Sequence, residues 1–195
     1  MDYRLSTIFT LVITLVFISP SLAQTYSLIN ETAGLDTWNR TTSVLFEQDE
    51  ASTTASLPWS FTFFGKTYST VNVYPDGILT FVAISPQQAG FNSEDSFRKT
   101  VAVAPHWDDL IGSVYKNEYS DRVVFTWEAV TREQFSGYPI TAKLTVQAVL
   151  YNTSDIRLRY GAINQTFNDT IVGITAGDNI NYYHNAWGNN NQTAF

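Results

Sequence analysis

The sequence predicts an all-β fold, an antiparallel β-sandwich or partly closed barrel of about eight to ten strands after an N-terminal signal peptide. Three observations lead to this class. Several short segments alternate apolar and polar residues, as half-buried strands do. Turn residues separate these segments at regular spacing, and no segment has the periodicity of a convincing amphipathic helix. The same lack of helices excludes parallel α/β folds.

Residues 1–23 are predicted to be a secretory signal peptide. Arg4 gives a weakly basic start, residues 8–18 are largely apolar, and small residues precede the cleavage position after Ala23. The competing interpretation is a retained anchor or a pilin-like helix, but a membrane span needs roughly twenty apolar residues. Cleavage leaves a mature chain of about 170 residues, the usual size of one domain.

Composition divides the mature chain into three parts. Residues 24–55 form a polar arm in which only Val44 to Phe46 suggests a short strand. Residues 56–188 hold the β-sandwich, and residues 189–195 form a tail that is expected to fray.

The first strands of the sandwich are predicted from alternation. In residues 57–64 the aromatic residues share one face and the polar residues share the other. A strand over residues 68–74 runs into Pro75-Asp76-Gly77, a turn in which the proline sets its own φ and the glycine accepts a positive φ. A third strand over residues 78–84 completes the hairpin.

The stretch from Val101 to Leu110 concentrates the polar chemistry of the chain. An apolar strand is predicted to end at Pro105, and the residues that follow it are His106, Trp107, Asp108 and Asp109. Residues 85–99, which precede this stretch, are predicted to be a polar loop with room for a short helical turn.

Further strands are predicted in the second half of the chain. The apolar residues that alternate between Leu144 and Leu150 are expected to face the core. The predicted segments are residues 112–115, 122–130, 140–151, 156–160 and 170–175, with an edge strand over residues 182–184.

The composition excludes several classes of function. The chain has 18 acidic and 11 basic residues, a net charge of −7, and the basic residues are scattered. No cationic surface is therefore predicted for nucleic acid. The chain has no cysteine, which removes disulfides, thiol catalysis and thiolate metal sites.

Six Asn-x-Ser/Thr sequons predict N-glycosylation on an exposed surface. Each of them has a residue other than proline in the middle position. The acceptor residues are Asn30, Asn39, Asn152, Asn164, Asn168 and Asn191.

Asp108 and Asp109 are the residues nominated for a metal site, with calcium as the ion. Calcium takes about six to eight oxygen ligands, so further ligands would have to come from Asp76, Glu128 or Asp178. The alternative is that the two aspartates cap a turn or accept backbone N–H bonds. Calcium is the only cofactor that the sequence leaves open.

The sequence also holds residues for two other kinds of site, a zinc site and a glycosidase site. Zinc would need His106 and His184 together with a carboxylate, but these histidines are far apart in sequence. A glycosidase would need two carboxylates, for which Asp108 and Glu128 could be nominated. The sequence has no nucleophile elbow and no glycine-rich phosphate loop. The protein is therefore predicted not to be an enzyme, with no catalytic residues.

Aromatic side chains in polar surroundings offer ring faces on which sugars can stack. The residues in such surroundings are Trp38, Tyr182, Tyr183 and Trp187. Their alternative role is ordinary packing at loops and edges. The tryptophans in or beside strands are instead expected in the core: Trp59, Trp107 and Trp127.

Several segments occur in a family-like order, among them Leu57-Pro-Trp-Ser-Phe-Thr-Phe-Phe, Val71-Asn-Val-Tyr-Pro-Asp-Gly, Val103-Ala-Pro-His-Trp-Asp-Asp-Leu and Val123-Val-Phe-Thr-Trp-Glu. Over roughly residues 57–175 the chain resembles the extracellular β-sandwich module related to the nidogen-like (NIDO) domain. The resemblance implies a secreted or surface-displayed module associated with adhesion or matrix contact, with no catalytic residues. His106 departs from the family, which often has an aromatic residue there, and the disulfides of the animal versions are missing.

The sequence therefore predicts a secreted, N-glycosylated, non-enzymatic protein of the cell surface or extracellular matrix that acts by adhesion or self-assembly. Expected partners are other copies of itself, or surface and matrix proteins and glycans, with no nucleic acid and no membrane span after signal cleavage. One alternative is a subunit of an extracellular filament or sheath, in which the arm over residues 24–55 donates a strand to a neighbour's sheet. Another alternative is a carbohydrate-binding or carbohydrate-active domain.

Overall fold

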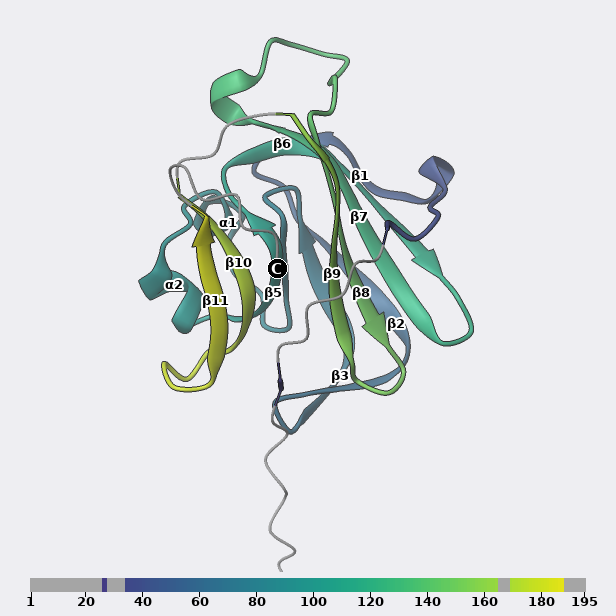
Figure 1. Cartoon of the computed structure of the whole chain (residues 1–195), viewed down its shortest axis with the longest axis vertical. Coiled ribbons are helices and arrows are strands. Elements are labelled where there is room, and N and C mark those ends of the chain that lie inside the picture. The colour runs from purple at the N-terminus through teal and green to yellow at the C-terminus, as the bar shows by residue number, and fades with distance from the viewer. Residues whose placement is uncertain (1–25, 28–33, 165–168, 188–195) are drawn as a thin grey trace, which may run out of the picture.

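The computed structural model describes residues 26–27, 34–164 and 169–187, which form two antiparallel sheets packed face to face (Figure 1). The predicted all-β sandwich is confirmed. The five-stranded sheet has the order β1-β6-β7-β8-β9, and the six-stranded sheet has the order β11-β10-β5-β4-β3-β2. The strands are β1 (Ser43–Gln48), β2 (Thr53–Phe63), β3 (Lys66–Tyr74), β4 (Ile78–Thr80), β5 (Val101–Trp107), β6 (Leu110–Glu118), β7 (Arg122–Thr131), β8 (Leu144–Tyr151), β9 (Ile156–Ile163), β10 (Thr170–Ala176) and β11 (Tyr182–Trp187).

The main core fills the space between the two sheets. The six-stranded sheet contributes aromatic rings, and Phe61 stacks on Phe81 with ring centroids 5.7 Å apart. The five-stranded sheet contributes every second residue of β7 and β8, and for β8 the alternation predicted this face. These residues are Val123, Phe125, Trp127, Ala129, Leu144, Val146, Ala148 and Leu150, all of them buried.

The hairpin predicted around Pro75-Asp76-Gly77 is present, but its second strand is short. β4 ends at Thr80, whereas the sequence predicted a strand to residue 84. Phe81 still donates its backbone N–H to the Val101 carbonyl at 2.9 Å, but at Ile84 the Tyr74 hydroxyl takes the place of a neighbouring strand. This hydroxyl accepts from the backbone N–H of Ile84 at 3.0 Å and donates to its carbonyl at 2.9 Å.

Residues 85–99, predicted to be a loop with room for a helical turn, contain the short helices α1 (Pro86–Ala89) and α2 (Glu94–Arg98). Ser85 begins α1 with a capping box, and the Ser93 side chain caps α2. The two helices cover a second, smaller core on the outer face of the six-stranded sheet, which includes Ala89, Phe97 and Trp107. None of the helices in the described ranges has the length and apolar character needed to cross a membrane.

The prediction that the strand ends at Pro105 is wrong, because β5 continues to Trp107. The pairing of β5 with β10 shifts register at this point. Ala104 lies opposite Gly173 and Trp107 lies opposite Ile171, so β5 carries one extra residue. Such a bulge tolerates a proline and reverses the direction of the side chains that follow. Trp107 is therefore buried as predicted, but in the second core.

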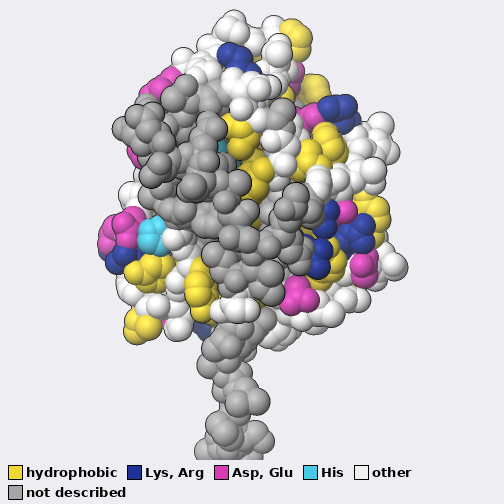
Figure 2. Space-filling model, viewed as in Figure 1, with side chains coloured by type: hydrophobic (Ala, Val, Ile, Leu, Met, Phe, Trp, Pro, Cys, Tyr) yellow, Lys and Arg dark blue, Asp and Glu magenta, His cyan; other side chains and the backbone are white. Residues whose placement is uncertain are grey.

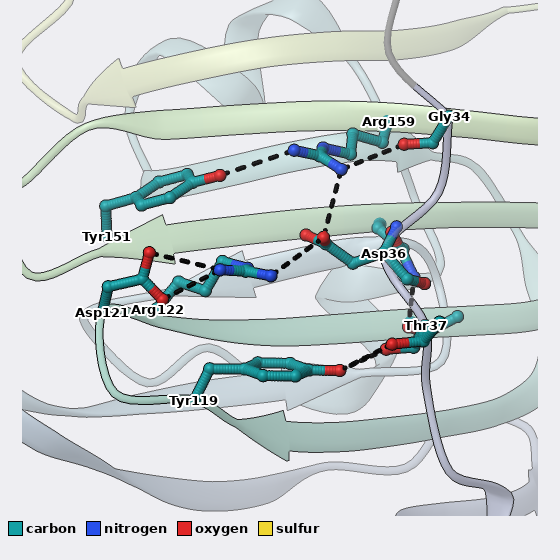
Figure 3. A network of polar contacts seen from close by, with 10 residues as sticks. Gly34, Asp36, Thr37, Tyr119, Asp121, Arg122, Tyr151 and Arg159 are labelled. Carbon is teal, nitrogen blue, oxygen red and sulfur yellow. Dashed lines mark hydrogen bonds and ion pairs between the residues drawn. The ribbon is translucent and has the colours of Figure 1, made fainter.

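The predicted boundary at residue 56 falls inside β2, and part of the predicted arm already belongs to the sandwich. Val44 to Phe46 lie in β1, which pairs with β6. Further upstream, residues 34–37 cross the outer face of the five-stranded sheet (Figure 3). The predicted signal peptide and the predicted tail over residues 189–195 lie outside the described residues.

A cluster of polar contacts, called here the Asp36 clamp, holds residues 34–37 on the sheet. The Asp36 carboxylate lies 3.3 Å from Arg122 and 3.2 Å from Arg159 (Figure 3). The Gln147 side chain accepts from the Asp36 N–H and donates to the Asp36 carbonyl, each at 2.8 Å. Arg159 also donates to the Gly34 carbonyl at 3.0 Å.

Asp36→Ala should lower the free energy of unfolding by about 1–3 kcal/mol, because it removes the shared carboxylate from two partly buried arginines. Denaturant unfolding of the mature chain measures the change. The control is Asp121→Ala, which removes a half-exposed partner of Arg122 and should cost less than about 1 kcal/mol. Equal losses in the two variants would contradict the role given to the clamp.

Candidate functional site

His106, Asp108 and Asp109 lie where the β3–β4 turn meets the end of β5. Two backbone hydrogen bonds join these segments: the N–H of His106 donates to the Gly77 carbonyl at 3.3 Å, and the N–H of Asp108 donates to the Asp76 carbonyl at 3.2 Å. Gly77 has a φ of +74°, and a Cβ there would lie 1.8 Å from the His106 carbonyl oxygen. Only glycine allows this approach.

Asp108 is tied into the structure on both sides. One carboxylate oxygen accepts from the backbone N–H of Asp109 at 2.8 Å, and the other accepts from the Thr170 hydroxyl of β10 at 2.8 Å. Burial is the main reason that the pKa of Asp108 is raised, and these hydrogen bonds offset part of it. Asp108 therefore fixes the turn that leaves β5, which was the alternative to its nomination as a metal ligand.

Asp76 is the most unusual residue of this junction. Burial raises the pKa of its carboxyl group to about 8, and the negative charges of Asp109 and Glu50 add to the effect. The backbone amides of Asp76 and Leu110 offset part of this increase, although they do not lie in hydrogen-bonding geometry. The fold thus brings Asp76 and Asp109 close together, as a calcium site would require.

The other two residues considered for that site lie elsewhere. Glu128 points away from the core on the outer face of the five-stranded sheet and pairs with Arg40. Asp178 lies in the β10–β11 turn, where it accepts from the backbone N–H groups of Ile180 and Asn181. Asp108 lies in the β5–β6 turn and bonds Thr170 of β10, whereas Glu128 pairs with Arg40, so the two carboxylates nominated for a glycosidase have separate partners.

The two histidines are also apart. His106 is buried, with Nε2 3.4 Å from the Thr170 hydroxyl, and burial lowers its pKa to about 3. Its imidazole is therefore neutral near pH 7. His184 on β11 lies 3.5 Å from Glu94. In the described part of the chain, no three side chains among His, Asp and Glu are arranged to hold a metal ion.

A second feature is a groove between the β2–β3 turn and the β10–β11 turn, with a volume of about 300 Å³. We call it the tyrosine groove, and its aromatic and apolar lining includes Tyr26, Phe64, Tyr68, Ile180 and Tyr183. Apolar side chains are visible on the β11 side of the molecule in Figure 2 (yellow, lower left). Tyr182 and Tyr183, both nominated from the sequence, line this groove. The other lining residues carry no sequence signal for it, because they meet only after β2, β3 and β10 have paired.

Among the aromatic residues nominated for sugar stacking, Trp38 and Tyr182 offer less of their ring faces to a ligand, because an arginine lies over each ring. Arg40 lies over the ring of half-buried Trp38 at 5.5 Å, and Arg98 lies over the ring of half-buried Tyr182 at 4.6 Å. The side chain of Trp187 lies outside the described part of the structure.

Three of the predicted glycosylation sites are described, and all three are exposed: Asn39, Asn152 and Asn164. They lie before β1, in the β8–β9 turn and after β9, respectively. Asn30, Asn168 and Asn191 lie outside the described residues.

His106→Gln should make the free energy of unfolding fall less steeply as the pH is lowered. In the unfolded chain the His106 imidazole takes up a proton below pH 6.5, whereas in the folded protein it does so only near pH 3. This residue therefore contributes stability that is lost as the pH falls through this window, at up to roughly 1.4 kcal/mol for each pH unit. The raised pKa values of Asp76 and Asp108 act in the opposite direction and are common to both proteins.

Urea unfolding of wild type and His106→Gln at about pH 7 and about pH 4.5 measures this difference. The variant is expected to be less stable at neutral pH but to lose less on acidification. Parallel losses in the two proteins would show that His106 takes up its proton equally in the folded and unfolded states.

The sequence model of the family described as NIDO related matches residues 25–194. Comparisons with curated proteins and with solved structures gave no match. The family match covers every described element of the sandwich, and it points to an extracellular domain. The chain belongs to the NIDO-related family.

Proposed function

We propose that the protein is a secreted, N-glycosylated, non-enzymatic module that acts by adhesion at a cell surface or in an extracellular matrix. The tyrosine groove carries this proposal, because it presents aromatic surface to solvent on a module of an extracellular family. The exposure of Asn39, Asn152 and Asn164 supports glycosylation. The hydrogen bonding of Asp108 within the turn and the complete burial of His106 support a non-enzymatic role.

The composition of the tyrosine groove fits a glycan ligand. Tyr183 is 44 % exposed and Ile180 is 79 % exposed, while Lys66 and Asn181 supply hydrogen-bond donors at the same groove. Tyrosine offers a rigid, amphipathic contact surface that loses little conformational entropy on binding. A sugar chain, which has both apolar ring faces and hydroxyl groups, is the ligand class that matches this combination.

Tyr183→Ala should weaken binding to an adhesive ligand by at least about tenfold, since exposed aromatic residues at the centre of a site carry much of its binding energy. Arrays of glycans and matrix proteins identify the ligand, and titration with the best one gives the dissociation constant. The control is Tyr138→Ala, because Tyr138 is 58 % exposed and lies outside the groove, before β8. Binding lost equally in both variants, or no binding by the wild type to any probe, would count against the proposal.

Self-assembly by strand exchange is the second candidate function. β1 lies at the edge of its sheet, and its pairing with β6 is interrupted by two register shifts. Leu45 is the one buried residue of β1, and the Asp36 clamp holds the chain upstream of it through polar contacts. The same contacts could form between two copies of the chain if β1 were exchanged.

A disulfide between β1 and β6 tests strand exchange. Ser43 and Tyr115 are direct cross-strand partners, and such partners lie about 4.5–5.5 Å apart, within the range for a disulfide. The chain has no cysteine, so Ser43→Cys with Tyr115→Cys gives one defined bond. Light scattering should show oligomers for wild type and for the reduced variant, and monomers for the variant oxidised at low concentration. Strand exchange would be rejected if oligomers persist after the disulfide has formed, or if the wild type stays monomeric at every concentration.

A further inference from the structure

Asp76 is buried, and the nearby backbone amides only partly offset the cost of ionising its carboxyl group. The side chain is 0 % exposed, and neither carboxylate oxygen has a hydrogen bond in the part of the chain that the structure describes. An ionised carboxylate in this situation is strongly unfavourable unless a proton or a cation neutralises its charge. Asp76 must therefore hold a proton or bind a cation.

The carboxyl group of Asp76 lies beside Gly90, together with two other oxygen atoms. A Cβ placed on Gly90 would lie 3.7 Å from the Gln87 carbonyl oxygen, 3.8 Å from Asp76 Oδ1 and 3.9 Å from Asp109 Oδ1. Apart from Gly90 and its two chain neighbours, these are the three heavy atoms nearest to that position. These three oxygens, here called the oxygen cradle, come from the α1 segment, the β3–β4 turn and the β5–β6 turn.

The charges around the oxygen cradle are acidic. Asp109 and Glu50 act on Asp76, and Asp108, Glu50 and Glu133 act on Asp109, in each case disfavouring the ionised carboxyl group. Arg132 is close in space, and its backbone N–H donates to the Asp109 carbonyl at 2.9 Å. Its guanidinium, however, pairs with Asp49. The surroundings therefore favour the entry of a cation.

We propose that the oxygen cradle binds a calcium ion, with Asp76, Asp109 and the Gln87 carbonyl as protein ligands. Calcium is the divalent ion that suits carboxylate and carbonyl oxygens in irregular geometry, and water commonly completes its coordination. Magnesium demands a stricter octahedral arrangement, and zinc prefers nitrogen and sulfur ligands. Asp108, which the sequence nominated, serves the turn, and Asp76 takes its place as the ligand.

Thermal unfolding of the full mature chain tests this site. After chelation with EDTA and dialysis, millimolar CaCl₂ should raise Tm by several degrees, because a ligand that binds only the folded state stabilises it. MgCl₂ at the same ionic strength should have a much smaller effect. Asp76→Asn, which keeps the size of the side chain but removes the charge, should abolish the calcium-dependent shift.

Gly90→Ala is the second variant, because it leaves both carboxylates in place. Gly90 has a φ of −72°, which alanine adopts readily, and the added methyl would make only ordinary contacts with the surrounding oxygens. The methyl would lie within 3.9 Å of all three oxygens, where it would hinder a cation from binding them together, so this variant should fold and lose the calcium shift. Asp178→Asn, in the remote β10–β11 turn, should retain the full shift.

Terbium luminescence, excited through tryptophan, gives a readout that does not depend on unfolding. Wild type should show a signal that calcium displaces, and Gly90→Ala should not. Three results would overturn the proposal: no calcium shift in wild type, equal shifts in wild type and Gly90→Ala, or equal shifts with CaCl₂ and MgCl₂. Binding at the tyrosine groove is independent of all three, so failure here leaves the adhesive function standing.

Discussion

The close approach of the β3–β4 turn to the end of β5 is the constraint on which the rest of the structure depends. It requires glycine at position 77, because any Cβ would collide with the β5 backbone. The five-stranded sheet holds both segments from the opposite side. The Trp127 indole N–H donates to the Tyr74 carbonyl at 2.8 Å, and the Tyr160 hydroxyl donates to the Pro105 carbonyl at 2.9 Å. The junction thereby connects the two sheets with both cores.

The same constraint explains why an aspartate is buried in a turn, a place where its side chain usually meets solvent. Pressing the turn against β5 encloses Asp76, and a calcium ion would turn this unfavourable burial into a link between three loops. β10 relates this junction to the tyrosine groove. Its first residue, Thr170, bonds Asp108, and its last residue, Ala176, lines the groove. The proposed calcium site and the proposed ligand groove therefore lie near opposite ends of one strand.

Much of the fold could be predicted from the sequence, because alternation and turn residues are local signals. The buried face of β8 and the turn at Pro75-Asp76-Gly77 are examples. The continuation of β5 past Pro105 was missed because the bulge that allows it depends on pairing with β10. The oxygen cradle was missed for a similar reason: Gly90 and Gln87 meet Asp76 only through tertiary packing. His106, which departs from the family pattern, fits there as a buried, uncharged ring.

A crystal structure of the mature protein grown with calcium tests the central claim most directly, namely that the junction encloses Asp76 as the ligand of a cation. The account predicts an ion with anomalous signal about 2.3–2.6 Å from Asp76 Oδ1, Asp109 Oδ1 and the Gln87 carbonyl oxygen. A water molecule at that position, or an Asp76 carboxyl group that is hydrogen-bonded to protein atoms instead, would contradict it.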